Sequence, residues 1–189
     1  TWVYSEADAD LVDEDTPLKA PSHLYTATKL TSEYYCISYD KLYGVATTIL
    51  RYGIPYGPRA RDGAVIPIFV SKALRGEPLT IAGDGSQFRQ FVYVEDLAEG
   101  NALALNPIAM HRTYNLDGAE KITIRQIAEA IQRIIGPVEI KSVEGRPGDF
   151  QGKEGVSLRA RDELGWIPQV SFEEGLRRYI EWYKDQHTT

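Results

Sequence analysis

The sequence predicts an α/β fold because two kinds of apolar pattern alternate along it. Segments with helical spacing, such as 22–43 and 123–135, are followed by short runs rich in β-branched residues, such as 45–52 and 138–143. This alternation is typical of helices that cover a largely parallel sheet. The run at 45–52 is apolar without alternating in polarity, which favours a strand buried on both faces of that sheet.

Composition places the chain among soluble globular proteins. Its 189 residues are 43% hydrophobic and 25% charged, so we expect one domain, or one domain and part of another. The net charge of −6 provides no basic surface for nucleic acid. Apolar runs fall far short of the roughly 20 residues of a membrane helix, so we expect no membrane partner. A single Cys excludes an internal disulfide framework and fits a cytoplasmic protein, and the three His residues lack metal-ligand spacing.

The beginning of the chain is apolar and does not start with Met. We interpret residues 1–4 as the end of a strand, so the sequence is expected to open inside a domain, as the C-terminal piece of a longer protein. Residues 5–21 are acidic and contain Pro, which predicts a loop.

The next segment predicts a helix followed by a strand. Ser22 is the expected N-cap of a helix that runs to about Tyr43, because Gly44 is a typical helix stop. With the strand at 45–52, this completes a strand–helix–strand unit. Ligands bind beyond the carboxyl ends of such strands, which here is the Gly- and Pro-rich turn at 51–59.

The remaining signals predict further elements in order. They are a helix at 65–75, strands at 79–82 and 89–94 separated by a turn at 83–85, a helix at 95–105, a strand at 113–116, a helix at 123–135, a strand at 138–143, a loop at 145–155, a short helix that ends near 164, and a helix at 171–184. Thr123 and Ser171 each begin the pattern of a capping box, which predicts the start of a helix. The Gly-Asp-Gly sequence at 83–85 indicates a turn.

Tyr25 and Lys29 form the candidate catalytic pair. Four residues apart, they lie on one face of the expected helix, one turn above the other. A tyrosine with its ordinary pKa of about 10 is a poor base, but a nearby positive charge favours the phenolate. The pair could therefore take a proton from an alcohol and return it. The alternative is a surface helix in which Lys29 pairs with Glu33 one turn later.

Short motifs then occur in a distinctive order. They are Val3-Tyr4, Pro21…Tyr25-x-x-x-Lys29, Leu50-Arg51-Tyr52…Tyr56-Gly57-Pro58-Arg59, Ile66-Pro67, Gly83-Asp84-Gly85-Ser86-Gln87-x-Arg89, Phe91-Val92-Tyr93-Val94-Glu95-Asp96, Tyr114-Asn115, Arg146-Pro147-Gly148-Asp149 and Leu164-Gly165-Trp166-x-Pro168. This ordered set resembles the second half of an extended short-chain dehydrogenase/reductase of the NAD-dependent nucleotide-sugar epimerase/dehydratase group, similar to UDP-glucose 4-epimerase. The resemblance spans nearly the whole chain, although Tyr-x-x-x-Lys alone is a weak signal.

The resemblance implies roles for individual residues. Tyr25 and Lys29 would be catalytic and would contact the cofactor NAD; Tyr52, Gly53 and Ile54 would lie beside its nicotinamide; Val65, Thr80, Ile81, Ala82, Arg89 and Arg146 would bind a nucleotide-diphosphate sugar. No metal site is implied. The guanidinium forks of Arg89 and Arg146 suit a diphosphate. Ordinary surface arginines are the alternative.

The resemblance also implies a division into domains and an assembly. Residues 1–60 would be the C-terminal part of a Rossmann-type doubly wound sheet. Residues 61–189 would form mainly a smaller α/β substrate-binding domain, with about 89–116 returning to the Rossmann sheet. The Tyr25 helix would join a helix bundle between two subunits, which implies a homodimer.

The chain departs from the family pattern at several positions. The family's catalytic Ser/Thr falls just before Thr1, so Thr1 itself is a less favoured candidate. Ser5 replaces a Gly, and Gln90 replaces an Asp. Ile54 stands near the place of an Asn, so one polar contact to the substrate is expected to be missing.

The glycine fingerprint of a dinucleotide site is absent from its expected context. Gly148, Gly152 and Gly155 imitate its spacing, but they follow a Gly-Arg-Pro sequence rather than a buried strand and are interpreted as a loop. We therefore expect this chain alone to bind NAD poorly.

The reaction implied is epimerisation through a transient 4-keto sugar. Dehydratases and decarboxylases of the family need acidic groups directly after the Ser/Thr, and Thr1 and Trp2 carry none. A nucleotide-4-ketosugar reductase is one alternative. A non-catalytic sugar-nucleotide-binding or dimerisation module is another.

Overall fold

The computed structural model describes residues 2–145 and 152–187. The elements are η1 (Trp2–Tyr4), β1 (Leu11–Val12), α1 (Leu24–Tyr43), β2 (Thr48–Tyr52), β3 (Ile54–Tyr56), α2 (Val65–Leu74), β4 (Leu79–Ala82), β5 (Phe88–Tyr93), α3 (Val94–Leu103), η2 (Pro107–Ala109), β6 (Arg112–Leu116), β7 (Lys121–Thr123), α4 (Ile124–Ile135), β8 (Ile140–Val143), β9 (Glu154–Gly155), α5 (Leu158–Leu164) and α6 (Phe172–His187). Their alternation confirms the predicted α/β class.

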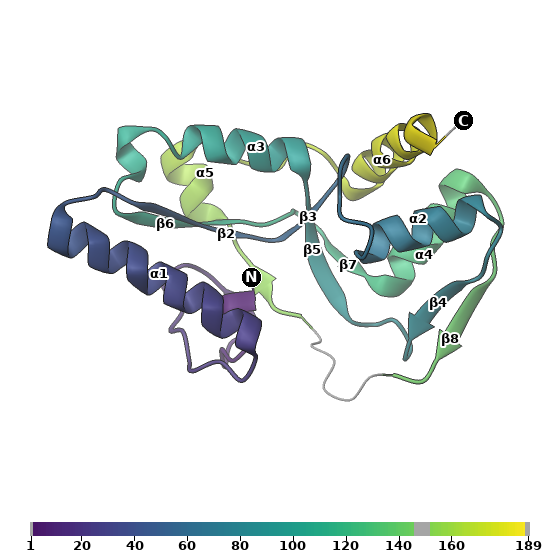
Figure 1. Ribbon diagram of the computed structural model, residues 1–189, viewed down its shortest axis with the longest axis horizontal. Helices are drawn as coiled ribbons and strands as arrows, with labels where there is room; N and C mark the ends of the chain where they lie inside the picture. The colour runs from purple at the N-terminus through teal and green to yellow at the C-terminus, as the bar shows by residue number, and fades with distance from the viewer. Residues whose placement is uncertain (1, 146–151, 188–189) are drawn as a thin grey trace.

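The strands pair mostly in parallel. β2 pairs with β6, β3 with β5, β4 with β8 and β1 with β9, all parallel, while β5 pairs antiparallel with β7. In Figure 1, α1 lies on one side of β2 and β6, and α3 and α5 lie on the other. The helices α2, α4 and α6 gather at the opposite end of the molecule, with β4 and β8 at its edge (Figure 1).

Three apolar clusters form the core. The largest is built from α2, α4, α6 and the strands beside them, and it includes Phe69, Ile81, Ile127 and Leu176. A second surrounds Trp166 below α3. A third joins η1 to Leu30 of α1. The clusters bury the apolar faces of α2, α4 and α6, which stabilises helices of this length, whereas α1 buries only Thr26 and Leu30.

Helix α1 confirms the segment with the candidate catalytic pair. It ends where predicted, at Gly44, whose φ of 67° and N–H bond to the Asp40 carbonyl form a left-handed cap. The predicted N-cap Ser22 is wrong by one residue: the His23 side chain accepts a hydrogen bond from the Tyr25 N–H instead. The Ser22 hydroxyl bonds to Glu6 and is therefore engaged elsewhere.

Other expectations near the chain start are wrong. Trp2–Tyr4 is a 3₁₀ turn rather than a strand end, since a strand needs a hydrogen-bonded neighbour and the described residues provide none there. The expected turn at 51–59 contains the strand β3, in which Pro55 is tolerated. Strand β2 is not buried on both faces: Thr48, Ile49 and Leu50 are half-buried, Arg51 is buried and Tyr52 is exposed, because β6 is its only strand neighbour among the described residues.

The later elements follow the prediction within a few residues. The capping box at Thr123 is confirmed, since its hydroxyl accepts from the Gln126 N–H and the Gln126 side chain accepts from the Thr123 N–H. The loop expected at 145–155 ends in β9. In the two described ranges, no helix is long and apolar enough to cross a membrane, and no cluster of side chains could hold a metal ion.

Candidate active site

The structure places Tyr25 and Lys29 together at the start of α1. The Lys29 ammonium lies over the Tyr25 ring, 5.2 Å from its centroid. Tyr25 is 51% exposed, so its phenol is open to a ligand rather than sealed in the core. The helical spacing therefore brings the two side chains to one accessible surface, as predicted from sequence.

Glu33, the alternative partner of Lys29, is paired with Arg51 instead. Both carboxylate oxygens of Glu33 accept from Arg51 of β2, at 2.9 Å and 2.7 Å. Arg51 also donates to the Tyr4 hydroxyl at 2.7 Å, and Tyr4 donates to Asn115 of β6 at 2.8 Å. Burial raises the pKa of Tyr4 to about 12, despite the opposing charge of Arg51, so Tyr4 stays a neutral donor.

This chain of contacts fixes α1, which carries the candidate catalytic pair, to the sheet. It joins α1, β2, η1 and β6 through side chains that are largely buried, and a buried charge is tolerated only when it is paired in this way. Sequence reasoning missed it, because Glu33 and Arg51 are 18 residues apart and Tyr4 and Asn115 are 111 apart. The signal that could have found it is a charged Arg inside the apolar run at 45–52.

Trp2 connects the candidate catalytic pair with Arg89. Its ring meets the Tyr25 ring edge-on, with centroids 6.3 Å apart, and it lies 5.5 Å from the His23 ring. The Arg89 guanidinium lies 6.0 Å from the Trp2 ring centroid and donates to the Phe88 carbonyl at 2.6 Å. Arg89 of β5, which is predicted to bind the diphosphate, thus lies one aromatic ring away from Tyr25, the candidate acid/base.

The predicted cofactor segment follows the carboxyl end of β2. The Tyr52 hydroxyl donates to Asn101 of α3 at 2.7 Å, so this side chain is turned toward that helix. Gly53 is buried, and its N–H donates to the Leu116 carbonyl at 2.9 Å. Ile54 begins β3 and packs partly against the large core. The backbone of this segment is the part that could face a ring system.

Apart from Arg89 on β5, the described residues predicted to bind substrate lie on α2 and β4. Val65 begins α2 and is half-buried, and Ala82 is half-buried at the end of β4. The Thr80 hydroxyl accepts from Lys72, and the Ile81 side chain is fully buried in the core, so Ile81 could contact a ligand only through its backbone. Arg146 lies outside the described residues.

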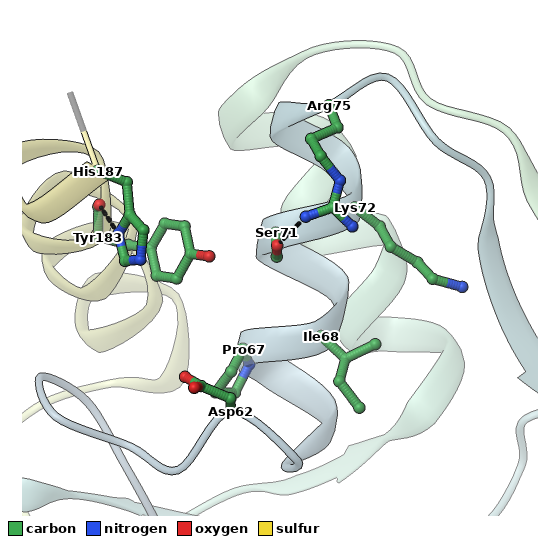
Figure 2. Close-up of a pocket in the computed structure, with 8 residues that line it drawn as sticks. All are labelled: Asp62, Pro67, Ile68, Ser71, Lys72, Arg75, Tyr183 and His187. Carbon is green, nitrogen blue, oxygen red and sulfur yellow. Dashed lines mark hydrogen bonds between the residues drawn. The ribbon is translucent and has the colours of Figure 1, made fainter. Parts of the chain in front are cut away.

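A cavity of about 320 Å³ lies elsewhere, between α2 and α6. Figure 2 shows its lining residues, which are Asp62, Pro67, Ile68, Ser71, Lys72, Arg75, Tyr183 and His187. None of the predicted site residues is among them. Arg75 bonds Ser71 and Glu77, Lys72 bonds Thr80, and the Tyr183 and His187 rings stack 4.0 Å apart. These polar groups already have partners, so the cavity is not a candidate catalytic site.

Comparison with known proteins identifies the family of the chain. The sequence profile of the NAD dependent epimerase/dehydratase family matches residues 2–117. The UDP-glucuronate 4-epimerase of Thermodesulfobacterium geofontis is 33% identical over 174 residues, which is 91% of this chain and 54% of that protein. The chain thus spans little more than half the length of this relative.

Solved structures show the same fold. The UDP-glucuronic acid 4-epimerase of Bacillus cereus, in complex with UDP-glucuronic acid and NAD, has a TM-score of 0.90 at 28% identity, over 98% of this chain and 60% of that one. The dTDP-glucose 4,6-dehydratase DesIV of Streptomyces venezuelae, with NAD bound, has a TM-score of 0.90 at 30% identity, over 98% and 58%. The chain therefore belongs to the NAD-dependent epimerase/dehydratase family.

Proposed function

We propose that this chain is the catalytic and substrate-binding part of an NAD-dependent epimerase that inverts C4 of a nucleotide-diphosphate sugar. The observation that carries the proposal is the exposed Tyr25 with the Lys29 ammonium over its ring, linked by Trp2 to Arg89. An acid/base pair beside a guanidinium suits a ligand with an alcohol at one end and a diphosphate at the other.

The proposed mechanism assigns proton transfer to Tyr25. The Tyr25 phenolate takes the proton of the sugar 4-hydroxyl and later returns it. NAD, when bound, would accept the hydride from C4 and give it back. A 4-keto sugar connects the two steps. Lys29 holds its positive charge beside Tyr25 and would bond the nicotinamide ribose. Return of the hydride to the opposite face of the sugar gives the epimer.

The other site residues would hold the two ligands. The backbone at Tyr52, Gly53 and Ile54 would border the nicotinamide. Arg89 and Arg146 would bind the diphosphate. Val65 and the segment Thr80–Ala82 would border the nucleotide.

Epimerisation is favoured over dehydration by Trp2. Its indole packs against Tyr25, in the place where the family resemblance puts an acidic group in dehydratases. Relatives of both kinds match the chain. A nucleotide-4-ketosugar reductase remains the second candidate, because the same Tyr–Lys pair serves both reactions. A non-catalytic binding or dimerisation module is the third.

We also propose a homodimer and a cytoplasmic location. Besides Tyr25, helix α1 exposes four tyrosines on its surface, Tyr34, Tyr35, Tyr39 and Tyr43, which would pack in a helix bundle between subunits. The domain division proposed is 1–60 with 89–116 on the cofactor side, and the remainder of 61–189 on the substrate side.

The test is an assay of the protein at the full length that its gene encodes, with NAD and a panel of UDP- and dTDP-sugars. We expect interconversion of a 4-epimer pair and a loss of roughly 10²- to 10⁴-fold in kcat for Tyr25→Phe. Tyr34→Phe on the same helix is the matched control and should keep the parent rate. An unchanged rate in Tyr25→Phe removes Tyr25 from the mechanism. Net reduction of a supplied 4-keto sugar, without epimer exchange, identifies the reductase instead.

A further inference from the structure

Asp117, which directly follows β6, is a buried carboxyl group without a partner in the described part of the chain. It is 3% exposed, and neither of its side-chain oxygens makes a hydrogen bond there. Its backbone N–H donates to the Ser157 hydroxyl at 2.9 Å, so its main chain is held in place. Burial raises the pKa of the Asp117 carboxyl to about 7.

Other buried polar side chains of this fold do have hydrogen-bond partners. Asp96 is 4% exposed, yet it accepts from the Val170 N–H at 3.1 Å. The Gln90 side chain bonds the Gly155 N–H at 2.7 Å and two backbone carbonyls. A buried carboxyl without any donor costs free energy that an apolar side chain would not. Such an orphaned group calls for a partner that the described residues do not supply.

The position of Asp117 points to a ligand. Tyr52 and Leu116 are paired in register, so Gly53 and Asp117 leave the sheet side by side at its carboxyl edge. A Cβ on Gly53 would lie 3.0 Å from Asp117 Oδ1 and 2.7 Å from the Gln90 carbonyl oxygen. The carboxyl therefore occupies the direction in which a side chain at position 53 would project.

We propose that Asp117 is a ligand-binding residue, whose carboxyl accepts a hydrogen bond from an N–H or O–H group that a ligand places beside Gly53. The proposal rests on the proposed function, which puts the nicotinamide next to this glycine. Two donors fit the chemistry: the carboxamide N–H₂ of NAD and a hydroxyl of the sugar. The carboxyl would also supply, from the neighbouring strand, the polar contact that Ile54 cannot make.

A metal ion fits this position less well. In the described ranges, no three acidic, His or Cys side chains converge on a common point, and one carboxylate alone is a poor metal site. A charge-assisted hydrogen bond needs only one acceptor and is stronger in a buried setting.

The test compares Asp117→Leu and Asp117→Asn with the parent protein, at the full length that its gene encodes. Affinities for NAD and for UDP-glucose are measured separately by calorimetry, with urea unfolding alongside. We expect Asp117→Leu to weaken one ligand by roughly 10- to 100-fold while unfolding at the same or higher urea concentration. Asp117→Asn, which keeps a neutral acceptor, should fall between. A loss confined to NAD assigns the donor to the carboxamide, and a loss confined to UDP-glucose assigns it to the sugar.

Asp96→Asn is the matched control, since it alters a buried carboxyl that already has its donor. It should lower stability and leave both affinities within twofold. A folded Asp117→Leu or Asp117→Asn protein with both affinities unchanged overturns the proposal while the proposed function stands. A parent protein that binds neither NAD nor UDP-glucose overturns the proposed function, and the inference with it.

Discussion

Arg51 on β2 and Glu33 on α1 form a two-point ion pair, with Nε to Oε1 at 2.9 Å and Nη2 to Oε2 at 2.7 Å. Their side chains are 8% and 13% exposed, so water screens the pair little. Glu33 lies one turn beyond Lys29 on α1, the helix that carries Tyr25. The ion pair therefore ties the orientation of the candidate acid/base to the sheet.

Glu33→Gln should destabilise the protein strongly, because it leaves the Arg51 charge buried with less compensation. The expected loss is about 3 kcal/mol in the free energy of unfolding, measured by urea titration. Asp162→Asn is the control, since its pair with Arg161 is exposed and screened by water, and it should lower stability much less than Glu33→Gln. Equal effects of the two variants would show that the buried pair contributes no more to stability than the exposed one.

Lys29→Gln should lower catalysis with little effect on stability. The ammonium is exposed and lies over the Tyr25 ring, so its removal costs the fold at most about 1 kcal/mol. We expect kcat to fall by about tenfold or more, and Lys29→Arg, which keeps the charge, to fall less. Identical kcat values for the Gln and Arg variants would contradict a role for the charge.

Asp117→Asn should change how stability depends on pH. The folded-state pKa of about 7 lies above the ordinary Asp value of 3.8, so the folded protein holds this proton over a range in which the unfolded chain has lost it. Stability of the parent therefore falls as pH rises from about 4 to 7, and the full penalty applies above 7. This rise in the pKa corresponds to about 4 kcal/mol in the free energy of unfolding.

The measurement is urea unfolding of both proteins at pH 4 and pH 8. The variant should gain up to about 4 kcal/mol on the parent between the two pH values. Burial is the main cause of the raised Asp117 pKa, and the nearby Glu14 charge adds to it. Parallel pH profiles would mean that Asp117 is ionised at little cost.

Thr123→Ala should destabilise the protein by about 1 kcal/mol, because it removes the cap of α4. The Thr123 hydroxyl accepts from the Gln126 N–H at 3.1 Å, and the Gln126 side chain accepts in return at 2.8 Å. Thermal unfolding measures the loss. Ser171→Ala serves for comparison, since its hydroxyl accepts at 3.3 Å and should cost less. A larger effect at Ser171 would reverse the expected order.

Local signals predicted the helices well because they act within a few residues. Gly44 ends α1 and Thr123 begins α4 where the sequence indicates, since caps depend on the backbone groups beside them. Strands were harder, because a strand exists only with a neighbour. Trp2–Tyr4 has no such neighbour among the described residues, whereas Ile54–Tyr56, expected as a turn, finds one in β5.

The sequence by itself determined the α/β class, the helix at 24–43 and the placement of Tyr25 and Lys29 on one helical face, because helical periodicity is a local property. The tertiary structure alone decided that Glu33 belongs to Arg51 rather than to Lys29, that Trp2 stands between Tyr25 and Arg89, and that Asp117 lies buried beside Gly53. These relationships join residues from 18 to 87 positions apart, and only the packing of strands and helices brings such residues together.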